Sequence, residues 1–524
     1  MNGHAWAALG LCAALLGACG GTRPASPQPP PAKPVVVESQ AETQRTQTEP
    51  KRSAVAPTWT YSRLLRASLP VTPEELEDLQ AESLYSASVG GRLVWLDLHG
   101  RSARARLEQV RGPISLRLPD LSPELLRRVD DVATRFPVAV TYEPPDRAPH
   151  AAGSRSRDAE AAEQDVQALG SLRHVERMIL GLDIGPEFPD LRGCKGLKSF
   201  ELFEAKAQNE LYERLPAQLE ELLLGSIATN GSPQALLRLT KLKRLELSNS
   251  REFTVRDLAP LTQLEDLDFG DHLSDADVAD LQAFPSLRRF VTASPLTNAA
   301  IAHFAKLPKL RALGLLGTRI DDAGMSELAQ LTELQELTPP LGLSNDGIAR
   351  LAALNKLKTL VLTHSKITDA GMQELARLKH LETLDLSFNR LTDASAPSFA
   401  RLTNLQRLDL STSKIGDETA RAIAKLTRLR RLDLQGTGIT SAAVPFLLEL
   451  KTLRVLHVNN TSLNSEGILA LLALPNLRRY YTSITHSDSE TYRRIANTRQ
   501  LLDSVRLDCD TRRLRLPDTE CEDR

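Results

Sequence analysis

The 524-residue chain contains little of what several classes of protein need. Aromatic residues make up 4% of it, so few rings are available to stack on nucleic-acid bases. The 65 Lys and Arg are balanced by 66 Asp and Glu, and a net charge of -1 creates no field that would attract a polyanion. The few rings and the balanced charge together predict that nucleic acid is not a partner. The apolar stretch Ala5–Ala18 is too short to cross a bilayer comfortably.

Catalytic and metal-binding patterns are missing as well. The sequence has no Gly-x-x-x-x-Gly-Lys-Ser/Thr phosphate loop, no His-Glu-x-x-His zinc helix and no Gly-x-Ser-x-Gly nucleophile elbow. Its 5 cysteines include no Cys-x-x-Cys pair, so no zinc site is expected. We predict a protein without cofactor, metal or enzymatic activity. An enzyme would need chemistry within residues 57–165.

The N-terminus has the features of an export signal. The stretch Ala5–Ala18 ends in Leu16-Gly17-Ala18-Cys19, which resembles the lipobox of bacterial lipoproteins. The resemblance implies that Cys19 is lipidated and becomes the first residue of the mature protein; an unlipidated secretory signal is the alternative. It also implies a place in the bacterial cell envelope, at the outer membrane in a Gram-negative cell, with the body periplasmic or surface-exposed.

The segment behind this signal, residues 19–56, is rich in Pro, Gln, Thr and Ser and poor in large apolar residues. It cannot bury enough surface to offset the entropy lost on ordering. We predict a flexible tether that holds the body away from a membrane.

What the chain does have is one apolar pattern repeated along most of its length. Leu-x-x-Leu-x-Leu, with conservative replacements, recurs at steps of 22 to 25 residues, which defines a leucine-rich repeat solenoid. Clear copies are LKTLVLTHSKITDAGMQELARLKH from Leu357 and LQRLDLSTSKIGDETARAIAKLTR from Leu405. The fifteen copies start at positions 175, 197, 219, 242, 264, 287, 310, 334, 357, 381, 405, 429, 453, 477 and 502.

Each copy predicts a strand, a turn and a helix. Leu381, Leu384 and Leu386 alternate with outward residues, as a strand with one buried face requires. Stacked strands would form a parallel sheet on the concave side, with helices on the convex side. Because helices are wider than strands, this α/β array must curve into a horseshoe. We expect Pro339 and Pro340 to cause a bulge or break in the sheet, since proline cannot donate to the ladder.

One polar position recurs where each helix should start, and eight or nine residues with helical apolar spacing follow it. Side chains that can cap a helix occupy it, so we predict that these residues are N-caps. They are Asp275, Asn298, Asp322, Asn345, Asp369, Asp393, Asp417, Ser441 and Ser465.

The pieces ITDAG and IGDETARAIA resemble the helical leucine-rich repeats of the ribonuclease-inhibitor and F-box-associated types, and the GALA-type repeats of bacterial effectors. This resemblance implies the fold and leaves the ligand open.

Residues 57–145 contain three strand-like pieces at similar spacing, which fit either degenerate repeats or a cap, or else a small independent α+β domain. The predicted organisation is a signal peptide (1–18), a tether (19–56), degenerate repeats or a cap (57–145), a flexible linker (146–165), the repeat array (166–508) and a C-terminal cap or tail (509–524).

The outward strand positions of the last repeats form two polar columns. With strands about 4.8 Å apart, each column should be contiguous, and arginines would lie beside stacked acids that otherwise repel one another. We interpret this stripe as a candidate binding surface; the alternative is a self-neutralised solvated surface. The candidate residues are Asp385, Arg407, Asp409, Arg431, Asp433, His457, Arg479 and Tyr481.

Cys509 and Cys521 flank the end of the array. In an extracytoplasmic chain they could form a disulfide that staples the last coil; two free thiols are the alternative.

Together these features predict a non-enzymatic, lipid-anchored extracytoplasmic scaffold that recognises a protein partner through its concave face. The alternative is an envelope structural or adhesion protein that binds surface glycan or associates with itself.

Overall fold

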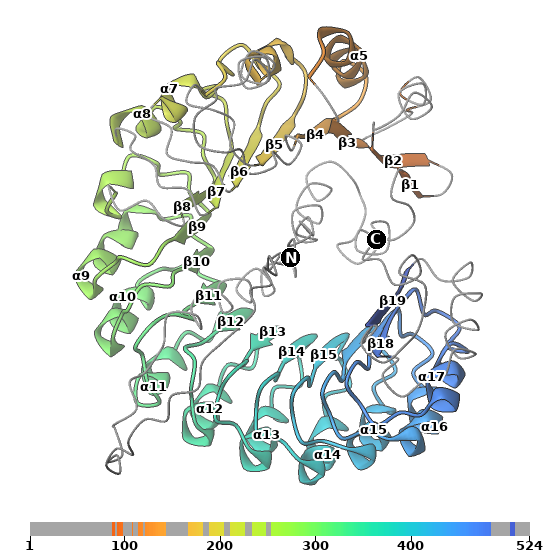
Figure 1. Ribbon diagram of the computed structural model, residues 1–524. Coiled ribbons are helices and arrows are strands. Elements are labelled where there is room, and N and C mark those ends of the chain that lie inside the picture. Colours follow the sequence, from red (N-terminus) through yellow and green to blue (C-terminus); the bar gives the residue numbers. More distant parts are fainter. Residues whose placement is uncertain are drawn as a thin grey trace, which may run out of the picture.

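The structure is a computed structural model. It describes residues 86–89, 92–97, 107, 110, 114–118, 121–142, 166–181, 188–203, 210–225, 233–247, 253–483 and 504–508. The predicted signal peptide, Cys19, the tether, the linker 146–165 and the pair Cys509 and Cys521 lie outside the described residues. The described chain forms successive coils that follow an open arc, with strands along its inner side and helices along its outer side (Figure 1).

The strands of the described residues form one sheet in chain order. The first two are antiparallel, and every later pair is parallel. The strands are β1 (Ser86–Val89), β2 (Arg92–Asp97), β3 (Ile114–Leu118), β4 (Val138–Tyr142), β5 (Arg177–Gly181), β6 (Ser199–Phe203), β7 (Glu221–Gly225), β8 (Arg244–Leu247), β9 (Asp266–Phe269), β10 (Arg289–Val291), β11 (Ala312–Gly314), β12 (Glu336–Thr338), β13 (Thr359–Val361), β14 (Thr383–Asp385), β15 (Arg407–Asp409), β16 (Arg431–Asp433), β17 (Val455–His457), β18 (Arg479–Ser483) and β19 (Ser504–Asp508).

This sheet confirms the predicted solenoid. Each of the fifteen template copies carries a strand that begins two residues after the template's first position, for example Thr359 after Leu357 and Arg407 after Leu405. The strand-like pieces nearer the N-terminus form β2, β3 and β4, which pair in sequence with one another and with β5. Residues 92–142 therefore contribute strands to the same sheet as the repeats.

Helices cover the outer side, but those of the array are shorter than the sequence predicts. The longest have seven residues, because a coil of 22 to 25 residues must also hold a strand and two turns. The α-helices are α5 (Pro123–Ala133), α7 (Leu211–Arg214), α8 (Pro233–Leu237), α9 (Asp275–Val278), α10 (Ile301–Phe304), α11 (Met325–Leu328), α12 (Asn345–Leu351), α13 (Asp369–Leu375), α14 (Ala396–Phe399), α15 (Asp417–Ile423), α16 (Val444–Leu447) and α17 (Ser465–Leu471). The 3-10 turns are η2 (Ala168–Ser171), η3 (Arg256–Leu258), η4 (Ala279–Ala283), η5 (Asn298–Ala300), η6 (Asp393–Ser395) and η7 (Ser441–Ala443).

The predicted N-cap register is wrong: in eight of the nine coils the cap is the residue before the predicted one, and in place of Asp322 it is Gly324. The cap of α13 is Thr368, and Asp369 is already the first helical residue. Asp369 instead accepts hydrogen bonds from the next coil, from the backbone N of Thr392 at 2.8 Å and from its hydroxyl at 2.7 Å. Thr392 in turn caps η6 by accepting from the backbone N of Ala394. Asp275 and Asp417 are bonded in the same way to Thr297 and Thr440, which cap the next coils.

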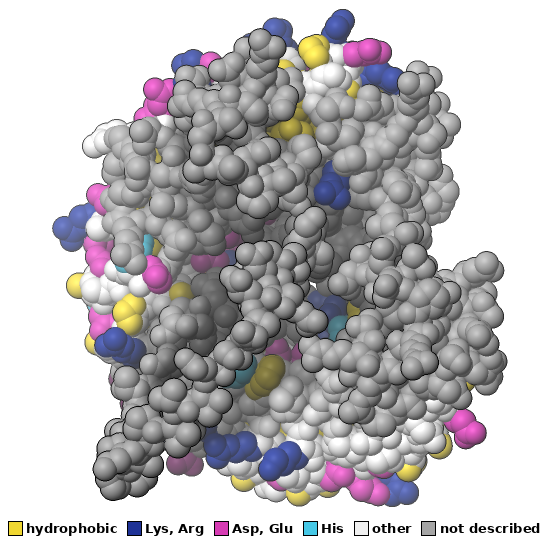
Figure 2. Space-filling view, viewed as in Figure 1, with side chains coloured by type: hydrophobic (Ala, Val, Ile, Leu, Met, Phe, Trp, Pro, Cys, Tyr) yellow, Lys and Arg dark blue, Asp and Glu magenta, His cyan; other side chains and the backbone are white. Residues whose placement is uncertain are grey.

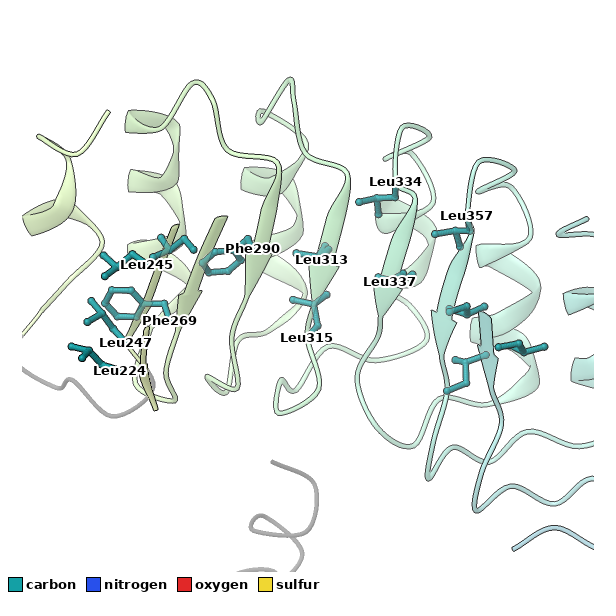
Figure 3. Packing of buried hydrophobic residues seen from close by; sticks show 14 of the residues in the cluster. Leu224, Leu245, Leu247, Phe269, Phe290, Leu313, Leu315, Leu334, Leu337 and Leu357 are labelled. Carbon is teal, nitrogen blue, oxygen red and sulfur yellow. The ribbon is translucent and has the colours of Figure 1, made fainter. Parts of the chain in front are cut away.

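The core lies between the strands and the helices and runs the length of the array. Inward leucines and phenylalanines of successive coils, such as Leu245, Phe269, Phe290 and Leu313, lie side by side along the array (Figure 3). Each fully buried side chain of this size contributes about 1.5–3 kcal/mol relative to an exposed one. None of the helices in the described part of the chain has the length and apolarity that a bilayer crossing requires.

Pro339 leaves a limited irregularity where the sequence predicts one. In other coils the residue at this position donates its backbone N–H to the next strand, as Leu315 does to the carbonyl of Thr338 at 2.7 Å and Leu362 to that of Asp385 at 2.8 Å. Pro339 has no N–H, and β12 pairs with β13 over two residues, whereas β11 and β12 pair over three. The sheet continues, but this interface is shorter.

Candidate binding site on the concave sheet

The two predicted polar columns align residue to residue across β14–β18. Asp385, Asp409, Asp433, His457 and Tyr481 are successive partners in the parallel ladder. The neighbouring column places arginines beside them, interrupted once by Val455; its members are Thr383, Arg407, Arg431, Val455 and Arg479. The structure thus brings all eight candidate residues to one stripe of the sheet.

The three aspartates are less accessible than an outward position suggests. Asp385, Asp409 and Asp433 are 2%, 6% and 8% exposed. Each also uses one carboxylate oxygen to accept a hydrogen bond from the backbone N two residues later, which holds the turn after the strand. These bonds are Ser387 N to Asp385 at 2.9 Å, Ser411 N to Asp409 at 2.9 Å and Gln435 N to Asp433 at 3.0 Å.

Burial also changes the acid–base properties of these carboxyl groups. It raises the pKa of Asp409 well above its usual value, and the negative charges of Asp385 and Asp433 raise it further. Burial raises the pKa of Asp385 in the same way. The adjacent arginines do not outweigh these effects. Asp385 and Asp409 are therefore parts of the folded framework that resist ionisation, and they make poor contacts for a partner.

Accessibility increases toward the C-terminal end of the stripe. Nδ1 of His457 lies 3.0 Å from Oδ2 of Asp433, and the His457 side chain is 16% exposed. The Tyr481 ring, which is partly exposed, lies with its centroid 4.0 Å from that of His457. Asp433, His457 and Tyr481 form one connected group, which we call the concave cluster.

Several polar atoms near this cluster are buried without a hydrogen-bond partner within the described part of the chain. They are Nε2 of His457, Oδ1 of Asn459 and Nε of Arg479. Buried polar atoms normally have a partner, and leaving one unsatisfied costs about 1–3 kcal/mol. These atoms therefore carry an unmet hydrogen-bonding demand just beneath the surface of the stripe.

Charges in the earlier half of the sheet pair across neighbouring strands. Arg289 lies 2.8 Å from Asp266 on the next strand, and Arg244 approaches the same carboxylate at 3.3 Å. Arg177 lies 3.3 Å from Glu221. Opposite charges on neighbouring strands neutralise this region.

Sequence reasoning missed a column at one edge of the concave sheet, which we call the rim column. Its residues follow β13–β17 and share a left-handed backbone with φ between 53° and 66°. They are His364, Phe388, Thr412, Gly436 and Asn460. The sequence signal is their exact 24-residue spacing, together with an aromatic residue in LSFN where the next repeats have LSTS and LQGT.

A search of the described residues for a metal-binding arrangement finds none. No group of three His, Cys, Asp or Glu side chains in these ranges is placed to hold a metal ion. Cys194 is a buried free thiol, and burial raises its pKa to about 12, so it is a weak nucleophile. Charged side chains of both signs are mixed over the outer surface on the face shown in Figure 2.

A comparison with protein families finds the repeat in the sequence. The family model described as leucine rich repeat matches residues 355–415 and 379–439, within the most regular coils. The fold of the described chain is a leucine-rich repeat solenoid. Proteins of this class usually act as protein-interaction scaffolds.

Several solved structures resemble parts of the chain. An internalin of Listeria monocytogenes is 23% identical, with a TM-score of 0.41, and the match covers 55% of this chain and 80% of that one. A leucine-rich repeat protein of Leptospira interrogans is 19% identical, with a TM-score of 0.38 and coverages of 79% and 95%. TLR13, in its complex with ssRNA13, is 17% identical, with a TM-score of 0.34 and coverages of 79% and 65%. No curated protein matches the sequence significantly.

Proposed function

We propose that this protein is a non-enzymatic scaffold, anchored through a lipid on Cys19 in a bacterial cell envelope, whose concave sheet binds a protein partner. The observation that carries the binding proposal is the concave cluster. A histidine held by Asp433 and packed on Tyr481 sits on the sheet with polar atoms around it that lack partners. The lipobox resemblance and the predicted tether support the anchor.

The contact centres on His457 and Tyr481. Tyrosine offers a rigid apolar ring with a polar tip and is enriched where partners bind. The His457 and Tyr481 rings are the partly exposed members of the stripe, and a partner whose binding turned the His457 or Arg479 side chain toward it would satisfy His457 Nε2 and Arg479 Nε, which are buried and unpaired in the described chain. Asp385 and Asp409 contribute indirectly, because their carboxylates hold the turns that end β14 and β15.

A photocrosslinking amino acid placed at Tyr481 in the full chain, in native membranes, tests this site. The crosslinked partner is identified by mass spectrometry, purified and titrated against the detergent-solubilised full chain. We expect His457→Ala and Tyr481→Ala each to weaken binding about tenfold, a loss of about 1.4 kcal/mol. His380→Ala, at an exposed position outside the stripe, is the matched control. Unchanged affinity in both cluster variants would exclude the concave cluster as the contact.

The anchor is tested separately by metabolic labelling with a palmitate analogue. Wild type and Cys12→Ala should incorporate the label, and Cys19→Ala should not. Label that persists in Cys19→Ala, or that is missing from the wild type, would contradict lipidation at this cysteine.

A further inference from the structure

Phe388 occupies a backbone conformation that a bulky side chain rarely adopts. It has φ 57°, in the left-handed region, as do the other members of the rim column. Gly436 and Asn460 are residue types that tolerate this region well. The conformation is therefore part of the repeat, but the repeat does not require phenylalanine there. A large ring at a position that favours glycine or asparagine points to a role outside folding.

The ring of Phe388 is also unusually accessible. Phe388 is 48% exposed, and no other large hydrophobic side chain in the described ranges is exposed. It stacks on His364 of the preceding coil, with the ring centroids 4.1 Å apart and the planes 12° from parallel. Burial lowers the pKa of His364, so this ring is neutral at pH 7. At the next two positions of the column, Thr412 has a small side chain and Gly436 has no side chain.

A row of cations runs beside this stack. Lys366, Arg390 and Lys414 each lie two residues after a member of the rim column, and all three are exposed. Their backbones lie in consecutive coils, since Arg390 N donates to Ile367 O and Lys414 N to Leu391 O, both at 2.9 Å. No ion pair is recorded for these three side chains within the described part of the chain. Among the described residues, the row therefore presents positive charge that no carboxylate pairs with, in the same coils as a flat apolar ring.

We propose that the rim column and this cationic row form a binding site for an acidic oligosaccharide, in which a sugar ring packs flat on Phe388 and its carboxylate or sulfate groups pair with Lys366, Arg390 and Lys414. The C–H groups on the face of a pyranose are weakly positive and suit the negative face of an aromatic ring. The backbone of the next coil lies beside Phe388, whose N–H donates to the Ser411 carbonyl at 2.9 Å. The exposed Thr412 is the next residue of the rim column, and its hydroxyl can bond a sugar hydroxyl.

This chemistry favours a glycan over a protein at the rim. Hot spots between proteins seat an aromatic anchor in a well-packed, desolvated pocket. Phe388 has no other exposed large apolar residue around it in the described chain, and its neighbours are hydroxyls and cations. The site shares no residue with the concave cluster. A failure of the protein-binding proposal would therefore leave this one intact, and the reverse also holds.

Isothermal titration of the detergent-solubilised full chain with defined probes tests the site. The acidic probes are an oligogalacturonate, which carries carboxylates, and a dextran sulfate oligosaccharide, which carries sulfates. A neutral maltooligosaccharide of similar length and a poly-glutamate peptide are the comparisons. We expect binding to at least one acidic sugar, weaker at high salt, and at least tenfold weaker binding of the neutral sugar and of the peptide.

Variants assign the binding to this surface. Phe388→Asn should weaken it about tenfold while folding normally, because Asn suits a left-handed backbone; Phe388→Tyr should retain it. Replacing Lys366, Arg390 and Lys414 together by Gln should abolish binding. The charge-matched control replaces Lys306, Lys309 and Lys425, which are exposed elsewhere on the array, and should bind as the wild type does.

The proposal is overturned if neither acidic sugar binds the wild type, or if the neutral sugar binds as tightly. It is equally overturned if poly-glutamate binds as tightly as the sugars and Phe388→Asn has no effect, since charge alone would then account for binding. Thermal unfolding of each variant confirms that it is folded, and the pair of Asn and Tyr variants at position 388 decides the outcome even where the triple variant is unstable.

Discussion

Nδ1 of His457 lies 3.0 Å from Oδ2 of Asp433 on the neighbouring strand. This contact, with Tyr481 packed on the same imidazole, sets the orientation of the ring and leaves Nε2 without a partner in the described chain. In a histidine, the bond made by one ring nitrogen governs what the other can donate or accept. Asp433 is therefore a positioning residue for the concave cluster.

Asp433→Asn should weaken binding of the crosslinked partner. The amide can still accept the Gln435 N–H that holds the turn, but it loses the charge facing His457. We expect a loss of about 1 kcal/mol, or roughly fivefold in Kd. Asp409→Asn, which leaves the pair of Asp433 and His457 intact, should keep the wild-type affinity. Equal losses in the two variants would contradict a positioning role for Asp433.

Asp409→Asn should raise the stability of the protein at neutral pH. The folded-state pKa of Asp409 lies above its usual value because of burial and the nearby Asp385 and Asp433, so the fold favours the protonated form. The resulting penalty is missing below the usual pKa of 3.8 and grows as pH rises through the folded pKa. Tm measured across pH should show a gain at pH 7 that disappears near pH 3.

Asp321→Asn serves as the opposite case. Hydrogen bonds from Asn298 and from the backbone of Gly324 and Ala323 lower the pKa of Asp321, so its charged form favours folding. This contribution is present above the usual pKa and lost as pH falls through the folded one. The variant should lower Tm at neutral pH and match the wild type in acid. If both substitutions shifted Tm in the same direction at pH 7, the electrostatic account would be wrong.

Asp369→Ala should loosen the contact between two coils. It removes both hydrogen bonds that Thr392 donates across a 23-residue step. We expect a loss of about 1–3 kcal/mol in urea unfolding, because the backbone N of Thr392 then lacks its acceptor. Asp346→Ala, at an exposed position in the first turn of α12, should change stability by less than about 0.5 kcal/mol.

Leu432→Ala tests the continuous core. Leu432 is fully buried at the centre of β16, directly beneath the concave cluster. The cavity left by the smaller side chain should cost about 2–5 kcal/mol. Hydrogen exchange should locate the loss in β15–β17, because each coil of a solenoid contacts its neighbours alone. A loss confined to coils far from β16 would contradict this description of the stack.

The fold was predictable because the leucine spacing sets both the strand positions and their register. The cap register was not predictable, because Thr368 and Asp369 are both polar and both suit a helix start. The structure shows that Thr368 is the cap, whereas Asp369 accepts a hydrogen bond from Thr392 of the next coil. The burial of Asp385 was not predictable either. Alternation places its side chain outward and the period gives its ladder neighbours, but the turn bond from Ser387 cannot be read from the period. The left-handed backbone of Phe388 could not be predicted, because phenylalanine rarely adopts a positive φ.

Pro339 has a mechanical consequence. The stability of a solenoid is close to a sum of terms for single coils and for the contacts between neighbours. The contact between β12 and β13 lacks a backbone rung that other coils have, so a pulling force along the array should part the coils there first. The array should therefore separate under load into two mechanical units, one ending at β12 and one beginning at β13. The concave cluster and the rim column both lie in the second unit.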